Sequence, residues 1–399
     1  MPRASRSRIL RRPAKMRLVP IYAAILLLVF HGSVIAYINS SYLEQFINAE
    51  GIGTIYTLGS ALSVLIFLFI SRVLKRVGNF HLTLGLLLID LLAVAGMSQA
   101  TGLEVAIPLF LLHIITVPMI IFNLDVFMEE RIGNDESGTG SSRGLLLTLA
   151  SLVGAVSPLV SGLLISEQAD SFNLVYMVSA GTLIPIIAIL IFFFKDFSDP
   201  QYGEIDLFSA IHTFFDNINL KSVFIANFLL QMFFVAMVVY IPLYMIDIVG
   251  LSWAQFGVIM FFAQLAYVIL EYPIGLIADR YIGEKEMMGF GFLIIAIATA
   301  WMSFITVPSV LIWSIVMFCS RVGAALVEVT TESYFFKQTT SSDAQIISFF
   351  RITRPLAYVM GALVGSLSLL YMSFNLIFIV FAALMIPAMF YTLNIEDTK

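Results

Sequence analysis

No charged residue interrupts residues 223–245, which read VFIANFLLQMFFVAMVVYIPLYM. A helix rises about 1.5 Å per residue, so a run of this length can cross the roughly 30 Å hydrocarbon core of a bilayer. The run has no charged face to turn toward water, as a surface helix of a soluble protein would have. It therefore predicts a transmembrane helix.

Eleven more apolar runs of similar length lie before and after this one. In the first half, the predicted spans cover residues 18–40, 53–74, 81–100, 104–128, 144–166 and 174–194. In the second half, they cover residues 221–246, 254–277, 287–305, 308–333, 345–368 and 372–393. We therefore predict an all-α membrane protein with twelve transmembrane helices.

The composition indicates a lipid environment. Of the 399 residues, 60% are apolar and 12% are charged, a balance that would not keep a water-soluble domain of this size dispersed. The formal charge of −5 gives no reason to expect a nucleic-acid partner. The single cysteine, Cys319, excludes an internal disulfide.

Lys and Arg alternate between successive connections, as the positive-inside rule requires. Neither residue occurs in the connections at 41–52, 98–103, 167–173, 247–253, 305–308 and 369–373. The alternate connections contain Arg72, Lys75, Arg76, Arg131, Arg143, Lys195, Lys221, Arg280, Lys285 and Lys337. We therefore expect both termini in the cytoplasm and a multi-pass protein of the cell membrane. The basic N-terminal segment precedes a full-length span without a small-residue cleavage site, so we interpret that span as retained.

The two halves of the sequence resemble each other. A shift of 203 residues pairs Tyr37 with Tyr240, Glu44 with Asp247, Asp125 with Glu328, Glu129 with Glu332 and Gly162 with Gly365. Like residues at equivalent depths indicate a duplicated six-helix unit. We predict an N-terminal six-helix bundle at 1–195, a cytoplasmic linker at 196–220 and a C-terminal six-helix bundle at 221–399. Apolar residues recur at helical spacing in the linker, which predicts an amphipathic helix lying either on the inner membrane face or on the ends of the bundles.

The turn Gly275-Leu276-Ile277-Ala278-Asp279-Arg280-Tyr281-Ile282-Gly283-Glu284-Lys285 is similar to the G-x-L-A-D-R-x-G-R-K loop of the major facilitator superfamily, with one residue inserted. With its two six-helix halves, cytoplasmic termini and central linker, nearly the whole chain resembles that superfamily. The equivalent turn of the first half, 71–80, keeps Gly78 but has Lys75 where the family usually has an acid. The resemblance implies that Gly275, Asp279, Arg280 and Gly283 act in gating, although the turn could equally be a tight connection with a topology signal.

Residues 154–162, Gly-Ala-Val-Ser-Pro-Leu-Val-Ser-Gly, resemble a weakened G-P-x-x-G-G element of drug/proton antiporters in the superfamily. Small residues and a proline also suit close packing of two helices. The resemblance implies a secondary active transporter that works by alternating access, and we favour proton-coupled efflux of amphipathic compounds. Uptake of a sugar or organic solute, ligand sensing without transport, and lipid flipping are the alternatives.

Ionisable residues at membrane depth are costly, so each is a candidate for the solute or proton path. Our candidates for this path are Arg321, Glu328, Asp125, His31, His113 and Glu271. Asp90 is a weaker candidate, because the resemblance places span 3 at the periphery. Arg321 falls near the middle of span 10 and is the strongest candidate, either facing substrate or held in a permanent ion pair with Glu328 or Asp125.

A second set of charges lies one or two turns nearer the cytoplasm. Glu129, Glu332, Arg351 and Arg354 could form an inner gate whose salt bridges break as the halves rock, or they could be permanent pairs.

The sequence gives little support for an enzyme. No H-E-x-x-H pair and no cysteine cluster occurs, and Gly140-Ser141-Ser142-Arg143-Gly144 lies in a polar loop, where a G-x-S-x-G match is chance. Without a P-loop, we expect no ATP dependence, and we expect no cofactor and no metal. The expected partners are a small-molecule substrate, protons as the coupling ion and the lipid bilayer, with the protein as a monomer.

Overall fold

In the computed structural model, the described residues are 14–132, 136–167, 171–202, 207–338, 349–350 and 352–396. These residues form helices and their connections, with no β-strand among them. Twelve helices are long and apolar enough to cross a membrane. The predicted fold class is therefore confirmed.

The first six spans contain α1 (Ala14–Ala36), α3 (Ala49–Phe67), α5 (Asn79–Met97), α6 (Leu103–Ile132), α7 (Glu136–Glu167) and α8 (Asn173–Phe193). Two short helices connect them, α2 (Asn39–Glu44) and α4 (Ile70–Val77). Helix α4 is amphipathic and separates Arg72, Lys75 and Arg76 from the apolar span before it. The membrane helices observed here are therefore shorter than the spans predicted at 18–40 and 53–74. The last residues of each predicted span belong to a separate short helix, α2 or α4.

The last six spans begin with α10 (Ile218–Val235), which continues through η1 (Ala236–Tyr240), α11 (Ile241–Leu243) and η2 (Tyr244–Ile248). Pro242 lies in this span and has no backbone N–H to donate, which explains why π-helical turns flank it. The other spans contain α12 (Trp253–Ile277) with η3 (Ala278–Ile282), α13 (Glu284–Met302), α14 (Val310–Lys337), α16 (Thr353–Tyr371) and α17 (Ile377–Leu393) after the short η4 (Phe374–Leu376). Helix α16 begins at Thr353, whereas the predicted span begins at residue 345. Pro355 lies in the first turn of this helix, where proline is well tolerated.

Helix α9 (Leu207–Asp216) lies between the two sets of spans. Its Phe214 is buried and contacts Phe224, Phe335 and Phe349 of the second half. The predicted apolar stripe contains Ile205, Phe208, Ile211, Phe215 and Ile218. Ile211 packs against the same buried cluster as Phe214, whereas Phe215 is exposed. Helix α9 therefore packs on the end of the second set of spans through Ile211 of the stripe and through Phe214 beside it.

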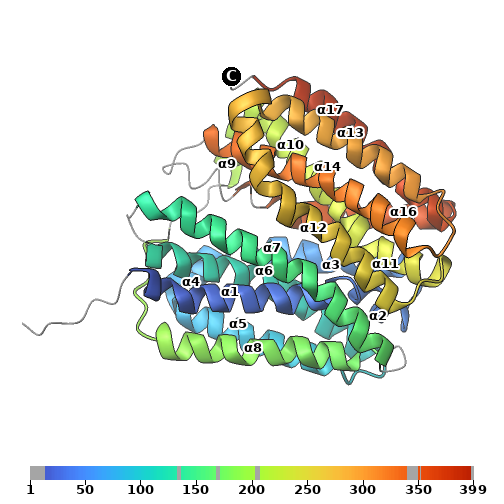
Figure 1. Ribbon diagram of the computed structural model, residues 1–399. Helices are drawn as coiled ribbons and strands as arrows, with labels where there is room; N and C mark the ends of the chain where they lie inside the picture. The colour runs from blue at the N-terminus through green and yellow to red at the C-terminus, as the bar shows by residue number, and fades with distance from the viewer. Residues whose placement is uncertain are drawn as a thin grey trace, which may run out of the picture.

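Figure 1 shows the first-half helices in blue to green beside the second-half helices in yellow to red. Helix α1 begins and α17 ends on the side where α4 and α9 lie, which we call the terminal face (Figure 1). Helices α2 and α11 lie on the other side, the opposite face. The halves meet mainly where α12 packs on α7 and where α16 packs on α3.

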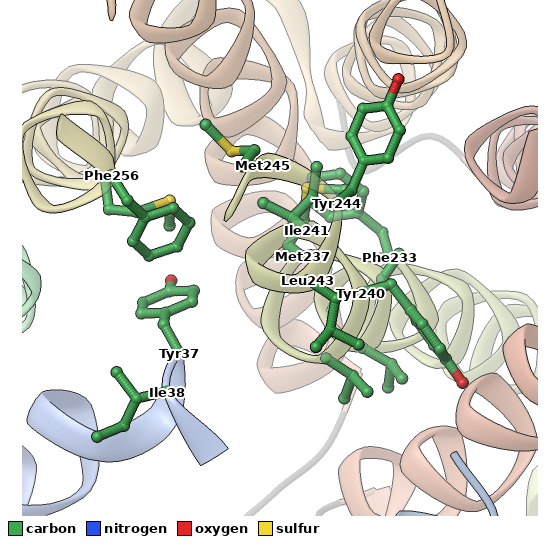
Figure 2. Packing of buried hydrophobic residues seen from close by; sticks show 14 of the residues in the cluster. Tyr37, Ile38, Phe233, Met237, Tyr240, Ile241, Leu243, Tyr244, Met245 and Phe256 are labelled. Atoms are coloured by element: carbon green, nitrogen blue, oxygen red, sulfur yellow. The ribbon is translucent and has the colours of Figure 1, made fainter. Parts of the chain in front are cut away.

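The two halves share a hydrophobic core toward the opposite face. Tyr37 and Phe110 of the first half belong to the same buried cluster as Tyr240, Tyr244 and Phe256 of the second. Figure 2 shows Tyr37 pointing at Phe256 across this seam, with their ring centroids 6.0 Å apart. Toward the terminal face, the first half has a buried cluster of its own, and the second half has two others. Burial of apolar surface thus joins the halves most strongly at the opposite face.

Glycines bring the backbones of α7 and α12 into contact at this seam. A Cβ atom on Gly162 would lie 2.4 Å from the Trp253 carbonyl oxygen, and one on Gly257 would lie 2.5 Å from the Pro158 carbonyl oxygen. No side chain larger than hydrogen fits at either position without moving the helices apart. The 154–162 element therefore has a packing function in this conformation, which is closed at the opposite face.

Candidate functional site

A buried polar cluster joins four helices of the first half. We call it the His–Asp–His cluster, and it consists of His31 on α1, Asp90 on α5 and His113 on α6. His31 Nε2 lies 3.0 Å from Asp90 Oδ2, and His113 Nδ1 lies 2.9 Å from Asp90 Oδ1. Thr116 donates to the same Asp90 Oδ1 at 3.0 Å, and His31 Nδ1 lies 3.0 Å from the Ser179 carbonyl oxygen on α8. The cluster therefore ties α1, α5, α6 and α8 together.

The contacts of His31 orient its ring. His31 Nδ1 lies 3.0 Å from the Ser179 carbonyl oxygen and 2.8 Å from the Ser179 hydroxyl, and that hydroxyl donates to the His31 carbonyl oxygen at 2.9 Å. A carbonyl oxygen only accepts, so Nδ1 is the donor toward Ser179. Nε2 faces the Asp90 carboxylate.

These three side chains are also close enough to suggest a metal site, since their ligand atoms lie within 4.8 Å of one another. The closest N···O distances are 2.9 and 3.0 Å. Ligands held at about 2.0 to 2.1 Å around a tetrahedral zinc ion would stand about 3.3 Å apart or more. The observed spacing is that of direct hydrogen bonds, and we interpret the cluster as a hydrogen-bonded lock.

Arg321 is a buried charge of the second half that lies beside two aromatic rings. It lies on α14, two residues before Gly323, whose backbone packs against Gly291 of α13. Two residues turn a helix by about 200°, so Arg321 points away from α13. Its side chain is 1% exposed, and its guanidinium carbon lies 5.3 Å from the ring centroid of Phe233 and 5.9 Å from that of Phe234.

The guanidinium of Arg321 lacks the partners that a buried cation normally has. Within the described part of the chain, its Nε and Nη1 atoms have no hydrogen-bond partner and it forms no salt bridge within 4 Å. The two aromatic rings stabilise a cation by about 0.5 to 2 kcal/mol each, less than the several kcal/mol that burial of a charge costs. This conformation therefore leaves the Arg321 charge under-compensated.

Four charged residues stand within electrostatic range of Glu328. Together with Glu328 they form what we call the ionic cluster, which consists of Arg321, Glu328, Glu332, Glu271 and Arg354. In the part of the chain that the structure describes, the cluster contains three carboxyl groups and two guanidinium groups. The carboxyl of Glu271 on α12 accepts a hydrogen bond from Ser151 of α7 at 3.3 Å, which links the cluster to the first half.

The remaining predicted path and gate residues lie in several places. Asp125 and Glu129 are exposed on α6 and have partners, and Arg354 is exposed on α16. Arg351 lies outside the described residues. His31 and His113, predicted for the path, lie in the closed His–Asp–His cluster instead of beside Arg321, and whether they carry protons stays a prediction.

A hollow of about 580 Å³ opens on the opposite face, between the halves. Its lining includes Glu44 at the end of α2 and Asp247 in η2. The two carboxyl groups hydrogen-bond to each other. Burial, with the hydrogen bond to Asp247 as the second cause, raises the pKa of Glu44 to about 8. From the sequence, Glu44 and Asp247 could be identified only as equivalent positions of the two halves.

The two turns on the terminal face share one backbone feature. Gly78 has a φ of 82° and Gly283 a φ of 94°, a conformation that side chains other than glycine rarely adopt. Gly275 lies inside α12, Arg280 is exposed in η3, and the side chain of Asp279 lies outside the described residues. The glycines therefore shape both turns, while the gating roles of these residues stay a prediction.

An acid from elsewhere in the chain occupies the first turn. Asp199 Oδ1, from the segment after α8, accepts a hydrogen bond from the backbone N–H of Asn79 at 2.7 Å, and Asp199 Oδ2 lies near Gly78. It therefore caps the positive N-terminal end of α5. This turn has Lys75 where the family usually has an acid. No local signal predicted Asp199, because it lies 120 residues from Asn79 in the sequence.

The equivalent helix start in the second half has a different arrangement. Glu284, the first residue of α13, is buried and forms an ion pair with Lys337 of α14. It also accepts a hydrogen bond from Ser333 at 3.0 Å. Each turn thus has one carboxylate at the start of the following helix, supplied from a different place in the sequence.

Comparison with known proteins gives consistent results. Residues 223–398 match the family model of the Major Facilitator Superfamily. No curated protein matches the chain in sequence. A crystal structure of the nucleoside transporter NupG is similar with a TM-score of 0.73 and 13% sequence identity, over 96% of this chain and 98% of that one. The POT family transporter PepTSo is similar with a TM-score of 0.74 and 11% identity, over 95% of this chain and 97% of that one. At these identities, the likeness establishes the fold.

Proposed function

We propose that the chain is a secondary transporter of the major facilitator superfamily, whose family model matches residues 223–398, and that it moves a small solute by alternating access. In this proposal the terminal face is cytoplasmic, the opposite face is external, and the protein lies in the cell membrane. The alternation of Lys and Arg between connections supports this orientation.

The observation that carries the proposal is Arg321, a buried guanidinium with unused donors that belongs to the ionic cluster at the contact between the halves. A solute with an acceptor group can use the free donors of Arg321. A proton can neutralise the carboxyl of Glu328, which lies near two other carboxyl groups. We therefore assign proton coupling to Glu328 and solute contact to Arg321.

The separate cores of the terminal face support the alternation of access. Rocking that opens the opposite face would expose part of the shared core, whereas movement at the terminal face leaves the first-half cluster intact. Among transport modes, we propose efflux of amphipathic compounds in exchange for protons. The aromatic rings of Phe233, which is buried, and Phe234, which is half-buried, lie beside Arg321 and suit a solute with both an apolar body and a polar group.

The test is flux in proteoliposomes over a panel of sugars, organic ions and drugs, with and without a pH gradient. We expect Arg321→Ala to reduce flux at least about tenfold, which corresponds to 1.4 kcal/mol of lost interaction. Glu328→Gln should abolish the response to the pH gradient while leaving exchange of solute without a gradient. Lys337→Gln is the matched control, because Lys337 pairs with Glu284 outside the ionic cluster.

Flux that neither Arg321→Ala nor Glu328→Gln alters would refute the assigned site. Binding of a solute without any flux would refute transport in favour of a ligand sensor. Flux independent of the gradient in the unmodified protein would refute proton coupling.

A further inference from the structure

The carboxyl pair at the hollow joins the two halves. Glu44 ends α2 of the first half, and Asp247 lies in η2 of the second, so their hydrogen bond crosses the seam. An ionised carboxylate can only accept a hydrogen bond, so two carboxyl groups bonded to each other must hold a proton between them. The contact therefore exists only while one of the two groups is protonated.

The pair occupies symmetric positions in the fold. Glu44 and Asp247 are separated by the same 203 residues that relate the two halves of the sequence. They lie on the opposite face, where the halves share their core. The hollow that they line also includes Trp253, whose backbone contacts Gly162 where α7 and α12 pack together. Movement of the halves that opens this face would pull the two carboxyl groups apart.

The residues that the structure describes bring no basic group to this face that could replace the proton, and its six connections contain no Lys or Arg in the sequence. The other ionisable groups that the described elements bring to this face are acids or phenols. They are Glu50 on α3, Glu104 on α6, Glu167 at the end of α7, Tyr42 on α2, Tyr176 on α8, Tyr244 on η2 and Tyr371 on α16. Two ionised carboxylates at this contact would therefore repel each other without compensation.

We propose that the proton shared by Glu44 and Asp247 is the latch that closes the opposite face, and that release of this proton to the external solution allows this face to open. The proposal rests on the orientation given under the proposed function. Asp247 is exposed at the hollow, so the proton can exchange with the solution on that side. Binding of an external proton would then favour the return to the conformation described here; since this proton enters and leaves on the same side, it controls the opening of the face and does not itself drive the transport assigned to Glu328.

The sign of the pH dependence follows from linkage. In the closed state, the pKa of Glu44 is raised from 4.5 to about 8. Below pH 4.5 both states are protonated, and the latch is fully formed. Between these two values the closed state binds one more proton than the open state, so the ratio of closed to open protein should fall up to about tenfold per pH unit as pH rises.

The experiment measures that ratio without a substrate. Nitroxide labels on Thr101→Cys and Val307→Cys, in a Cys319→Ser background, report the distance between the halves at the opposite face. Both sites are exposed, one in each half. Double electron–electron resonance in nanodiscs from pH 4.5 to pH 9 gives the closed and open populations. We expect a slope near one proton in the parent protein and a closed state at every pH in the double variant Glu44→Gln with Asp247→Asn.

Glu104→Gln serves as the matched control, because it removes an acid of the same face that is not paired with Asp247, and it should keep the parent slope. A parent protein whose populations do not change with pH would refute the latch even if the double variant does not fold. So would a parent-like slope in the double variant. If 1 mM calcium changes the closed and open populations and a chelator reverses this change, the latch is a bound divalent cation and not a proton. Because the readout needs no flux, failure of the latch and failure of transport are distinguishable.

Discussion

The two halves of this protein contain their buried charges in different ways. In the first half, Asp90 accepts hydrogen bonds from His113 and Thr116 on one oxygen, and His31 Nε2 lies 3.0 Å from the other. In the second half, Arg321 is as deeply buried but has only aromatic rings and distant carboxyl groups around it. A buried charge with polar partners around it stabilises one structure. A buried charge that lacks such partners is suited to binding a ligand or a proton.

This difference also assigns roles to the halves. The His–Asp–His cluster ties four helices of the first half into one unit, which can move as a rigid body. The ionic cluster lies where the halves meet, since Ser151 of α7 donates to Glu271 of α12. Rocking of the halves would leave the first cluster intact and change the partners of the second.

Asp90→Asn should have the largest effect on stability. It removes the buried carboxylate charge that His31 and His113 both face, and breaking a buried pair in this way costs about 3 to 5 kcal/mol. Thermal unfolding of the purified protein in detergent measures this loss. Glu328→Gln is the control from the ionic cluster, and we expect it to change stability little. Equal stability losses in the two variants would remove the distinction between the clusters.

Gly162→Leu should separate the halves at the opposite face. The added side chain must displace the Trp253 backbone, which lies 2.4 Å from the position of its Cβ atom. Overpacking of this kind costs about 1 to 3 kcal/mol, and this cost falls on the closed state. The distance between labels at Thr101 and Val307 should increase. Gly181→Leu is the control, because a Cβ atom at Gly181 meets no atom within 4 Å. An unchanged distance in Gly162→Leu would show that this contact does not hold the halves together.

Arg321→Met should leave folding intact or improve it. The substitution removes an under-compensated buried charge but keeps an apolar side chain of similar length beside Phe233, so we expect up to about 2 kcal/mol of added stability. The same thermal unfolding experiment measures it. A large loss of stability would instead make Arg321 a structural residue, like Asp90.

Asp199→Ala should have the smallest effect of the four. It removes the cap on the first backbone N–H of α5, and loss of such a cap costs about 1 kcal/mol. Asp199→Asn keeps an acceptor at this position and should retain most of the stability. If the two substitutions destabilise the protein equally, charge and not capping explains the contact.

The spans could be predicted from the sequence, because the apolar length of a helix is a local property. The rotation of each helix about its axis is not local, and this explains what was missed. Asp90 was considered peripheral because it lies on span 3, yet the structure turns it toward His31 and His113. The offset of 203 residues identified Glu44 and Asp247 as equivalent, but only the fold shows that they touch.

Two other features depend on contacts between distant segments. Asp199 lies in the linker and reaches the turn at Gly78, where the local sequence has Lys75 instead of an acid. The buried face of α9 is set by Phe214, since the aromatic residues that receive it come from three other segments. Sequence periodicity predicted that helix and Ile211 on its packed face, but not Phe214.

The central claim is that the halves rock about their shared core, so that the two faces open in turn. The most direct test measures two label pairs by electron resonance in nanodiscs, Thr101 with Val307 at the opposite face and Val77 with Tyr281 at the terminal face, all of them exposed. As pH is raised from 4.5 to 9, we expect the first distance to lengthen while the second shortens. Two distances that lengthen together, or that stay fixed under every condition, would contradict alternating access.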